Sequence, residues 1–389
     1  MKILLIHNNY GIYSGEEAVV DRQISMFQEL GHQVSVYRKT TEGLRGTAWG
    51  NIKGLLQGFY SPGAVRDIKQ IMQDDKPDVV VIHNLYPYIS PAVLKHIKRA
   101  GVPIVMVIHN YRLMCPTGLF MRNARPCELC LVKGNEWNCI RYNCEHSMIK
   151  SIGYAGRNWY ARITKAYSDN VDIFACITVF QTQKLTEAGF RNDRMRVIPN
   201  FVEDVAEPTF KLGEYIAVSG RISREKGFDL LLEVARETPD VKYVFAGTIR
   251  PEDKDLLKDP PANCEFLGHL SKDQLADFYE NSRFLVIASH WYEGFPMTIL
   301  DASSYGKAAI GPGHAGFLET IDNNITGLHF KPSDAGDLKE KIEKLWNNPD
   351  LCMEMGKNAF LKLKNNYTTE AVEKQWQALF SELHAHTSH

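Results

Sequence analysis

Short apolar runs alternate with segments of helical periodicity along most of the chain, which is the pattern of parallel α/β domains. Between the first two runs, Val20, Ile24, Phe27 and Leu30 form one apolar helical face, and Gly31 is a suitable stop after it. The pattern predicts ten strands, at residues 2–7, 33–37, 78–82, 103–108, 173–179, 195–198, 214–219, 241–246, 283–288 and 307–310.

A polar linker at residues 200–213 separates two halves of similar size. A chain of 389 residues is too long for one ordinary hydrophobic core. We therefore predict an N-terminal domain at residues 1–205 and a C-terminal domain at residues 206–368, followed by an amphipathic helix and a tail at residues 369–389. An irregular insert at residues 112–160 interrupts the first domain, and such inserts usually have a function.

The composition is that of a globular protein that binds no nucleic acid. Hydrophobic residues make up 44% of the chain, and 45 basic residues against 46 acidic ones give a formal net charge of −1. Nucleic-acid affinity comes largely from counterions released by a basic surface, which this chain lacks. The apolar residues 1–6 are too short for a signal sequence, and no run approaches the length of a membrane span. We therefore expect a cytoplasmic protein.

The segment from His290 to Asp301 concentrates the candidate chemistry. The apolar strand at residues 284–288 leads into it, so its acidic loop is expected at the carboxyl end of a strand. Pro296 suits the first turn of a following helix, where its missing N–H has no consequence. Free amides at such a helix start suit a phosphate. Glu293 would precede this helix and Asp301 would lie inside it, so the two carboxylates can contact different parts of one ligand.

This segment resembles the E-x7-E signature of retaining glycosyltransferases of family 4, which have the GT-B fold. Residues 220–227, Gly-Arg-Ile-Ser-Arg-Glu-Lys-Gly, are similar to that family's basic donor-phosphate loop. The first strand with Gly15 is similar to its glycine loop. The resemblance implies an α/β fold of two Rossmann-like domains facing each other across a cleft, with the last helix crossing back to the first domain. The chain departs from the signature at Asp301, where the family has Glu.

Under this resemblance the catalytic candidates are Glu293, His109, Arg221 and Lys226. Glu293 is expected to contact the donor sugar, and Asp301 the ribose of the nucleotide. Arg221 and Lys226 would stabilise the departing diphosphate, and such electrostatic stabilisation is usually the largest contribution to lowering the barrier. Without the downstream motif, the two residues would be interpreted as a solvated basic turn. The residues expected to bind the donor are Gly15, Arg221, Lys226, Gly294, Phe295, Pro296, Met297, Thr298 and Asp301.

His109 ends an apolar run, and the resemblance puts it where the first domain reaches the donor sugar. A histidine at a strand end can equally be an ordinary hydrogen-bonded polar group. His83 ends the preceding run in the same way and is a weaker candidate for the acceptor side. Asp253 and Asp255 match the D-x-D metal motif of a different glycosyltransferase fold, but they are interpreted as the charged first turn of a surface helix. Catalysis is therefore expected to need no metal.

Five cysteines lie in the insert, with a C-x2-C at their centre. Thiolates at this spacing can bind a structural Zn²⁺, whereas disulfides are rare in the cytoplasm. Free thiols are the remaining alternative. Some family members have a similar insert, and that resemblance implies Cys115, Cys127, Cys130 and Cys144 as zinc ligands, with Cys139 or His146 as substitutes for one of them.

The expected function is transfer of a hexose-type sugar from a UDP- or GDP-sugar to a saccharide or lipid-linked acceptor, in the assembly of cell-surface polysaccharide. No cofactor is expected for catalysis. A sugar-nucleotide epimerase of the same fold and an inactive sugar-nucleotide-binding protein are the alternatives. Residues 44–60 mix aromatic, apolar and cationic side chains, including Trp49 and Phe59. They could touch the inner face of the membrane, or they could form a helix that packs on its own sheet.

Overall fold

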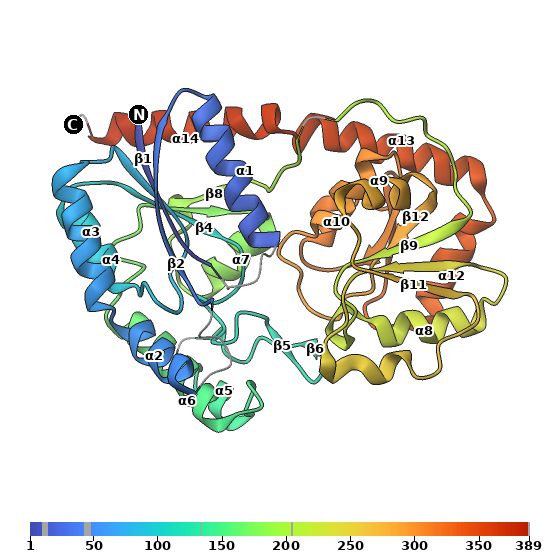
Figure 1. The fold of residues 1–389 in the computed structure, drawn as a ribbon, viewed down its shortest axis with the longest axis horizontal. Coiled ribbons are helices and arrows are strands. Elements are labelled where there is room, and N and C mark those ends of the chain that lie inside the picture. The colour runs from blue at the N-terminus through green and yellow to red at the C-terminus, as the bar shows by residue number, and fades with distance from the viewer. Residues whose placement is uncertain (10–14, 43–47, 133, 204, 388–389) are drawn as a thin grey trace. The chain divides into compact units, whose positions relative to one another are not determined.

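The computed structural model describes residues 1–389 except 10–14, 43–47, 133, 204 and 388–389 (Figure 1). The chain forms two compact units. The first comprises Met1–Phe120, Cys127–Pro199 and Gln375–His389, and the second comprises Met121–Pro126 and Asn200–Lys374. Each unit contains a six-stranded sheet, and the pairs of strands within these two sheets are parallel.

The sheet of the first unit has the strand order β2-β1-β3-β4-β7-β8. Every side chain of β3 and β4 is buried, because connecting helices cover the sheet. The strands are β1 (Lys2–Asn9), β2 (Gln33–Thr40), β3 (Val79–Asn84), β4 (Ile104–Ile108), β7 (Ile173–Cys176) and β8 (Met195–Val197). The helices are α1 (Gly15–Glu29), α2 (Ala48–Phe59), α3 (Pro62–Asp74), α4 (Ala92–Arg99), α5 (Asn138–Arg141), α6 (Met148–Ile163), α7 (Val179–Glu187) and the 3-10 helix η1 (Asn192–Arg194).

The sheet of the second unit has the order β11-β10-β9-β12-β13-β14. Its strands are β9 (Tyr215–Ser219), β10 (Tyr243–Ala246), β11 (Cys264–Gly268), β12 (Ser282–Val286), β13 (Ala309–Pro312) and β14 (Gly327–Phe330). Its helices are η2 (Arg224–Lys226), α8 (Phe228–Glu237), η3 (Pro251–Leu257), α9 (Lys272–Glu280), α10 (Met297–Ser304), α11 (Phe317–Thr320), α12 (Ala335–Trp346) and α13 (Pro349–Asn366). A two-stranded antiparallel sheet, β5 (Met121–Arg122) and β6 (Arg125–Pro126), completes the strands.

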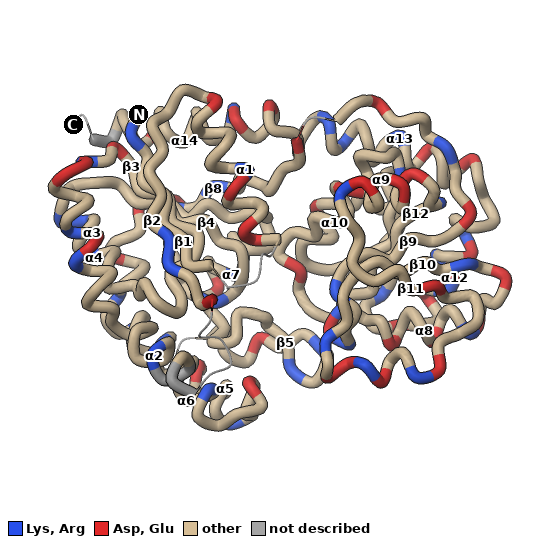
Figure 2. Tube along the Cα trace, in the orientation of Figure 1, with Lys and Arg blue, Asp and Glu red and all other residues tan. Residues whose placement is uncertain are grey.

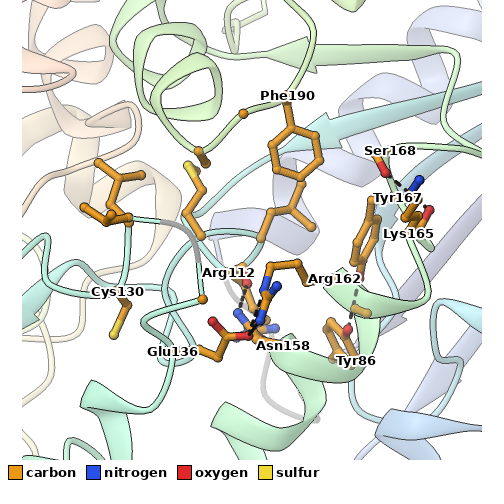
Figure 3. Close-up of a pocket in the computed structure, with 18 residues that line it drawn as sticks. Tyr86, Arg112, Cys130, Glu136, Asn158, Arg162, Lys165, Tyr167, Ser168 and Phe190 are labelled. Atoms are coloured by element: carbon orange, nitrogen blue, oxygen red, sulfur yellow. Dashed lines mark hydrogen bonds and ion pairs between the residues drawn. The ribbon is translucent and has the colours of Figure 1, made fainter.

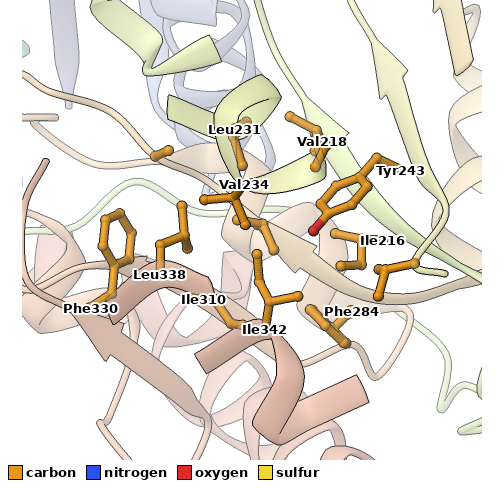
Figure 4. Packing of buried hydrophobic residues seen from close by; sticks show 14 of the residues in the cluster. Ile216, Val218, Leu231, Val234, Tyr243, Phe284, Ile310, Phe330, Leu338 and Ile342 are labelled. Atoms are coloured by element: carbon orange, nitrogen blue, oxygen red, sulfur yellow. The ribbon is translucent and has the colours of Figure 1, made fainter. Parts of the chain in front are cut away.

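One core cluster of the second unit lies between its sheet and the helices α8 and α12, and another includes Phe278 of α9 and Ile299 of α10. Figure 4 shows Leu231 and Val234 of α8 with Leu338 and Ile342 of α12, among side chains from the strands. Tyr243 is fully buried in this core, and its hydroxyl pairs with Thr238 Oγ1 at 2.8 Å. The pairing removes the penalty of burying a lone hydroxyl. This rigid layer fixes the strand ends that carry the candidate site.

The last helix, α14 (Thr369–Thr387), ends in the first unit. There Phe27 of α1 lies 5.2 Å from Trp376 and 5.3 Å from Phe380, measured between ring centroids. Both aromatic residues of α14 are buried. Gly31, just after α1, has φ +78°, a left-handed conformation that suits glycine at a helix end.

Charged residues of both signs are intermixed over the two units (Figure 2), in keeping with the formal net charge of −1. Among the described helices, none is both long and apolar enough to cross a membrane. The predicted α/β fold with two parallel sheets is confirmed, and each of the ten predicted strands is present within two residues of its expected start.

Candidate active site

Two loops of the second unit meet at the carboxyl ends of the adjacent strands β9 and β12. The basic loop follows β9 and the acidic loop follows β12. Gly227, at the end of the basic loop, has φ +71°, and a Cβ on it would lie 2.0 Å from the carbonyl oxygen of Ala288. Only glycine permits this contact, because any side chain would collide with backbone. The backbone N–H of His290 also donates to the carbonyl of Glu225 at 3.1 Å.

Glu293 is the centre of the acidic loop. Its side chain is buried and forms an ion pair with Lys226. Ser289 Oγ donates to Glu293 Oε1 at 2.8 Å, and Trp291 Nε1 donates to the same oxygen at 2.9 Å. All these contacts among the described residues fall on Oε1, so Oε2 is left for a ligand. The arrangement holds a carboxylate in a fixed orientation before any substrate arrives.

Two arginines flank one carboxylate beside this centre. Glu225 forms an ion pair with Arg221 and lies 3.5 Å from the guanidinium of Arg250. Burial, and then the nearby charge of Arg250, lowers the pKa of Arg221. Arg250 also lies 3.9 Å from Glu252, so two carboxylates balance the two arginines. The planar guanidinium donors suit an anionic group such as a diphosphate.

Helix α10 begins at Met297, and Pro296 is its N-terminal cap with φ −75° and ψ 92°. Pro296 therefore precedes the first turn and does not occupy it as the sequence predicted. Its ψ of 92° is extended and not helical, so the acidic loop includes Pro296 and the helix begins at the next residue. Gly294 passes close to another loop, since a Cβ on Gly316 would lie 2.6 Å from the Gly294 carbonyl oxygen.

The remaining donor-binding candidates lie on or next to α10. Phe295 is buried, with its ring 5.4 Å from that of Tyr367, and Met297 and Thr298 are partly buried at the helix start. Asp301 lies inside the helix as predicted. Its charge raises the pKa of both Tyr279 and Tyr305, after the larger effect of burial, so its carboxylate is close to this stacked pair of rings.

Sequence reasoning missed Glu225, Arg250, Ser289 and Trp291. Ser289 and Trp291 flank His290 in the motif itself, and their proximity to Glu293 was the available signal. Arg250 follows β10, the strand next to β9, and the parallel bridge between Ile222 and Ile249 aligns the two loops. Only the strand order makes that alignment visible.

Asp253 and Asp255 do not form a metal site with each other. Both carboxylates pair with Arg224, at 3.5 Å and 2.5 Å. Asp253 lies in the first turn of the 3-10 helix η3, which follows Arg250. These two acids therefore neutralise an arginine of the basic loop, which is a structural role.

Three histidines lie at the carboxyl ends of adjacent strands in the first unit: His7 on β1, His83 on β3 and His109 after β4. His83 Nδ1 lies 2.7 Å from His109 Nε2, and their rings stack at 5.0 Å. The ring of His7 lies 6.2 Å from that of His83. Neither ring nitrogen of His7 has a hydrogen-bond partner among the described residues.

These imidazoles are uncharged in the folded protein. Burial, and then the charge of Arg38, lowers the pKa of His7 to about 4. Burial, and then the proximity of His7, lowers the pKa of His109 to about 3, and burial first of all lowers that of His83 well below its usual range. The ends of these strands can therefore accept or donate neutral hydrogen bonds at physiological pH.

The histidines give a testable pH dependence. In the unfolded chain each titrates near 6.5, so below that pH the unfolded state binds more protons and the unfolding free energy falls. Each histidine should contribute a loss of about 1.4 kcal/mol per pH unit until the pH reaches its folded-state pKa. Urea unfolding at several pH values should show this slope, and His7→Gln should reduce it. His269→Gln, at an exposed position, should leave it unchanged; equal slopes in all three proteins would contradict the assignment.

The structure does not support the zinc site. All eight cysteines are free thiols, and the part of the chain that the structure describes contains no group of three or more His, Cys, Asp or Glu side chains that could hold a metal ion. Burial, and then Cys115, raises the pKa of Cys130 to about 12. The described residues therefore give no support for zinc at the expected ligands Cys115, Cys127, Cys130 and Cys144, or at the substitutes Cys139 and His146.

Other contacts hold the insert in place. Asn138 Nδ2 donates to the carbonyl of Leu129 at 2.9 Å, and Cys139 is fully buried. Arg162 of α6 forms an ion pair with Glu136 at 2.9 Å, and Glu136 is itself buried. The predicted insert is not irregular throughout, because most of α6 belongs to it. The part before α6 is tied to that helix by an ion pair whose acidic member is buried.

A cavity of about 370 Å³ lies between the insert, the end of α6 and the loop after α7. Figure 3 shows Arg112, Arg162 and Asn158 on one side of it and Phe190 on another. Asn158 Nδ2 donates to the carbonyl of Arg112 at 2.8 Å. Its walls combine three cationic side chains, those of Arg112, Arg162 and Lys165, with apolar residues that include Leu131, Ala161 and Phe190.

Gly15 is the first residue of α1. The loop before it, where the sequence predicted a contact with the diphosphate, lies outside the described residues. Nothing within 4 Å would meet a Cβ on Gly15.

Two family models match the chain. The model described as Glycosyltransferase Family 4 matches residues 13–205, and the model described as Glycosyl transferases group 1 matches residues 203–362. Among curated relatives, an uncharacterized 42.6 kDa protein in the cps region of Klebsiella pneumoniae is 25% identical over 365 residues. That match covers 85% of this chain and 90% of the relative.

Solved structures resemble the whole chain. Sucrose-phosphate synthase from Thermosynechococcus elongatus has a TM-score of 0.72 at 16% identity, and the match covers 99% of each chain. HepE from Anabaena, in complex with UDP and glucose, has a TM-score of 0.66 at 14% identity and covers 98% of this chain and 100% of its own. At these identities the likeness shows the fold alone.

Proposed function

Because this chain belongs to the family 4 glycosyltransferases of the GT-B fold, we propose that it is a retaining enzyme that uses a UDP- or GDP-activated hexose. The acceptor is a saccharide or a lipid-linked saccharide in polysaccharide assembly. The relative in the cps region of Klebsiella pneumoniae and the UDP complex of HepE support this proposal.

In the proposed reaction, the bond between the anomeric carbon and the β-phosphate oxygen breaks, and its electron pair leaves with the nucleoside diphosphate. The acceptor hydroxyl attacks on the same face and forms the glycosidic bond. Its proton passes to a phosphate oxygen. Negative charge grows on the diphosphate and positive charge on the sugar ring, and fixed charges stabilise both.

We assign Arg221, Lys226 and Arg250 to the diphosphate and Glu293 to the sugar. The observation that carries the assignment is the fixed Glu293 carboxylate, held through Oε1 by Ser289, Trp291 and Lys226. An oriented acid beside arginine and lysine side chains suits a sugar diphosphate. For His109, only the resemblance supports a contact with the donor sugar. Asp253 and Asp255 both pair with Arg224, and the proposed chemistry assigns no divalent metal to them.

A nucleotide screen followed by product analysis tests the proposal. UDP or GDP, and the matching hexose conjugate, should raise the thermal midpoint of the full chain by mass action. With an α-linked donor and a saccharide acceptor, NMR of the product should show an α linkage. A β-linked product would contradict retention, and nucleotide binding without turnover of any donor would favour the inactive binding protein.

Asp301 gives a sharper prediction for donor binding. Asp301→Asn should weaken nucleotide affinity by roughly tenfold, the effect of one hydrogen bond to a charged group, and change turnover at saturating donor much less. Asp301→Glu should be tolerated. Calorimetric titration of UDP or GDP, together with kcat at saturation, separates the two effects. A fall in kcat at unchanged nucleotide affinity would contradict the ribose assignment.

A further inference from the structure

Helix α6 exposes its bulky apolar side chains and buries its small ones, the reverse of the usual arrangement in a globular protein. Ser151, Gly153, Ala155 and Ala161 face inward and are buried. The exposed apolar side chains, with their exposed fractions, are Met148 49%, Ile149 75%, Ile152 50%, Trp159 36%, Tyr160 39% and Ile163 49%.

The exposed residues form one continuous stripe. At 100° per residue they occupy an arc of about 120° on the helix, which also contains Gly156 and no charged residue. Arg162 lies just beyond one edge of the arc and Lys150 beyond the other. The stripe is therefore apolar along its whole length and cationic at both sides.

Close packing fixes α6 in this orientation. A Cβ on Gly153 would lie 2.1 Å from Leu55 Cδ1, so α2 sits directly against this part of the helix. Arg157 is buried on the inner side, with its guanidinium 3.9 Å from the ring centre of Tyr86, and it donates to the carbonyl of Pro116 at 3.2 Å. Turning the stripe inward would bury six large side chains and break the contacts of buried Arg157. The packing therefore keeps the stripe exposed.

Residues around the helix extend the stripe into a surface. Trp137 of the insert is 47% exposed, and its ring lies 6.1 Å from that of Trp159. Figure 1 shows α2, α5 and α6 side by side at one end of the first unit. We define the α6 face as the six exposed residues of α6 together with Leu56, Tyr60, Trp137 and Tyr142, which are also exposed.

The charges around the α6 face are mostly positive. Between residues 138 and 165, the exposed charged residues are Arg141, Lys150, Arg162 and Lys165, and the one acid, Glu145, is partly buried. Among the described residues, neither Lys150 nor Lys165 forms an ion pair. Anionic lipid headgroups would pair with these two lysines.

We propose that the α6 face docks on a bilayer that contains anionic lipids. Trp and Tyr side chains prefer the boundary between headgroups and acyl chains, and Ile and Met can enter the acyl region. The cations at the edges then reach the headgroup phosphates. This proposal goes beyond the transferase function and does not depend on it.

The cavity beside the insert has matching chemistry. Arg162 and Lys165, which line it, lie at and just after the end of α6, and the rest of its lining mixes apolar residues with polar ones that include Glu136 and Asn158. Docking on the α6 face would bring the mouth of this cavity to the height of the headgroups. An anionic amphipathic molecule could then enter without crossing bulk water.

The sequence left two interpretations of residues 44–60, a membrane contact or a helix that packs on its own sheet, and the described part of that stretch contacts α6. Phe59 packs on α6, with its ring 5.9 Å from that of Tyr160 and its Cζ 3.3 Å from a Cβ built on Gly156. The side chain of Trp49 lies outside the described residues. Helix α2 therefore supports the α6 face, to which it contributes Leu56 and adjacent Tyr60.

Co-sedimentation of the full chain with vesicles tests the proposal. Wild type should bind vesicles of phosphatidylglycerol mixed with phosphatidylcholine. Ile149→Ser with Ile152→Ser should lower the partition coefficient at least about tenfold, because two buried side chains are lost from the bilayer. Lys150→Gln with Lys165→Gln should lower it about fivefold per cation, and only on anionic vesicles. A matched control is Ile325→Ser with Leu361→Ser, equally exposed on the second unit, which should bind as wild type does.

Two outcomes would overturn the proposal. One is wild-type binding to anionic vesicles no stronger than that of the Ile149/Ile152 variant, with both proteins folded by circular dichroism. The other is a wild-type oligomer that this variant converts to a monomer, which would make the α6 face an interface between copies. Donor hydrolysis in solution should be the same in wild type and variant, so failure of membrane binding stays distinct from failure of the transferase function.

Discussion

Glu293→Gln should lower turnover of the nucleotide-sugar donor by a factor of about 10² to 10³, the range found when one preorganised transition-state contact is lost. The amide keeps the size of the side chain and can still accept from Ser289 and Trp291 through its oxygen. It loses the ion pair with Lys226 and the negative charge next to the sugar. Donor hydrolysis and transfer, measured at saturating donor, report the change.

A carboxylate elsewhere in the same unit provides the control. Glu265 pairs with Lys242 at 2.7 Å on the surface, where such pairs contribute little. Glu265→Gln should leave both turnover and the thermal midpoint unchanged. If Glu293→Gln retained wild-type turnover while Glu265→Gln behaved as expected, Glu293 would have no role in the chemistry.

The second large effect concerns the two arginines at Glu225. Arg221→Ala and Arg250→Ala should each lower turnover, because each removes roughly 2.7–4 kcal/mol of transition-state stabilisation. Neither should destabilise the fold strongly, because the remaining arginine still neutralises Glu225. Burial, and then repulsion from Arg250, lowers the pKa of Arg221. Removing either arginine relieves this repulsion, which offsets part of the ion pairing with Glu225 that is lost. Steady-state kinetics and thermal midpoints, taken on the same preparations, separate the two effects.

Arg224→Ala is the matched control for these variants, because Arg224 belongs to the same loop and pairs with Asp253 and Asp255 instead. Its loss should affect turnover far less. A double variant of Arg221 and Arg250 that folds and keeps wild-type turnover would remove both from the proposed diphosphate contact.

The sheets could be predicted because most of their buried strands contain a continuous apolar run. The strand at Val79–Asn84 is buried at every position, and such a run has few alternatives in a chain of this length. Two edge strands of the second unit escaped prediction. Cys264–Gly268 alternates between exposed and partly buried positions, and Gly327–Phe330 is only four residues long with Gly and His in it. These edge strands form because they pair with a neighbouring strand of the sheet, and the local sequence does not show that pairing.

The site divides along the same line. Glu293, Arg221 and Lys226 could be proposed from one motif each, and the structure brings Lys226 into contact with Glu293 across 67 residues of chain. Arg250 could not be proposed from the sequence, because its position beside the site depends on the order of β9 and β10 in the sheet. For the cysteines, the spacing in sequence suggested a metal, whereas the described residues contain no group of side chains that could hold one.

The contact between Gly227 and the Ala288 carbonyl has a consequence for engineering this enzyme. The basic loop and the acidic loop touch through bare backbone, so neither can be exchanged alone. A donor loop grafted from a relative would have to bring a glycine to that position, or the graft would push the arginine and the acid apart. Libraries that aim to change the donor should therefore vary the two loops together and hold residue 227 fixed.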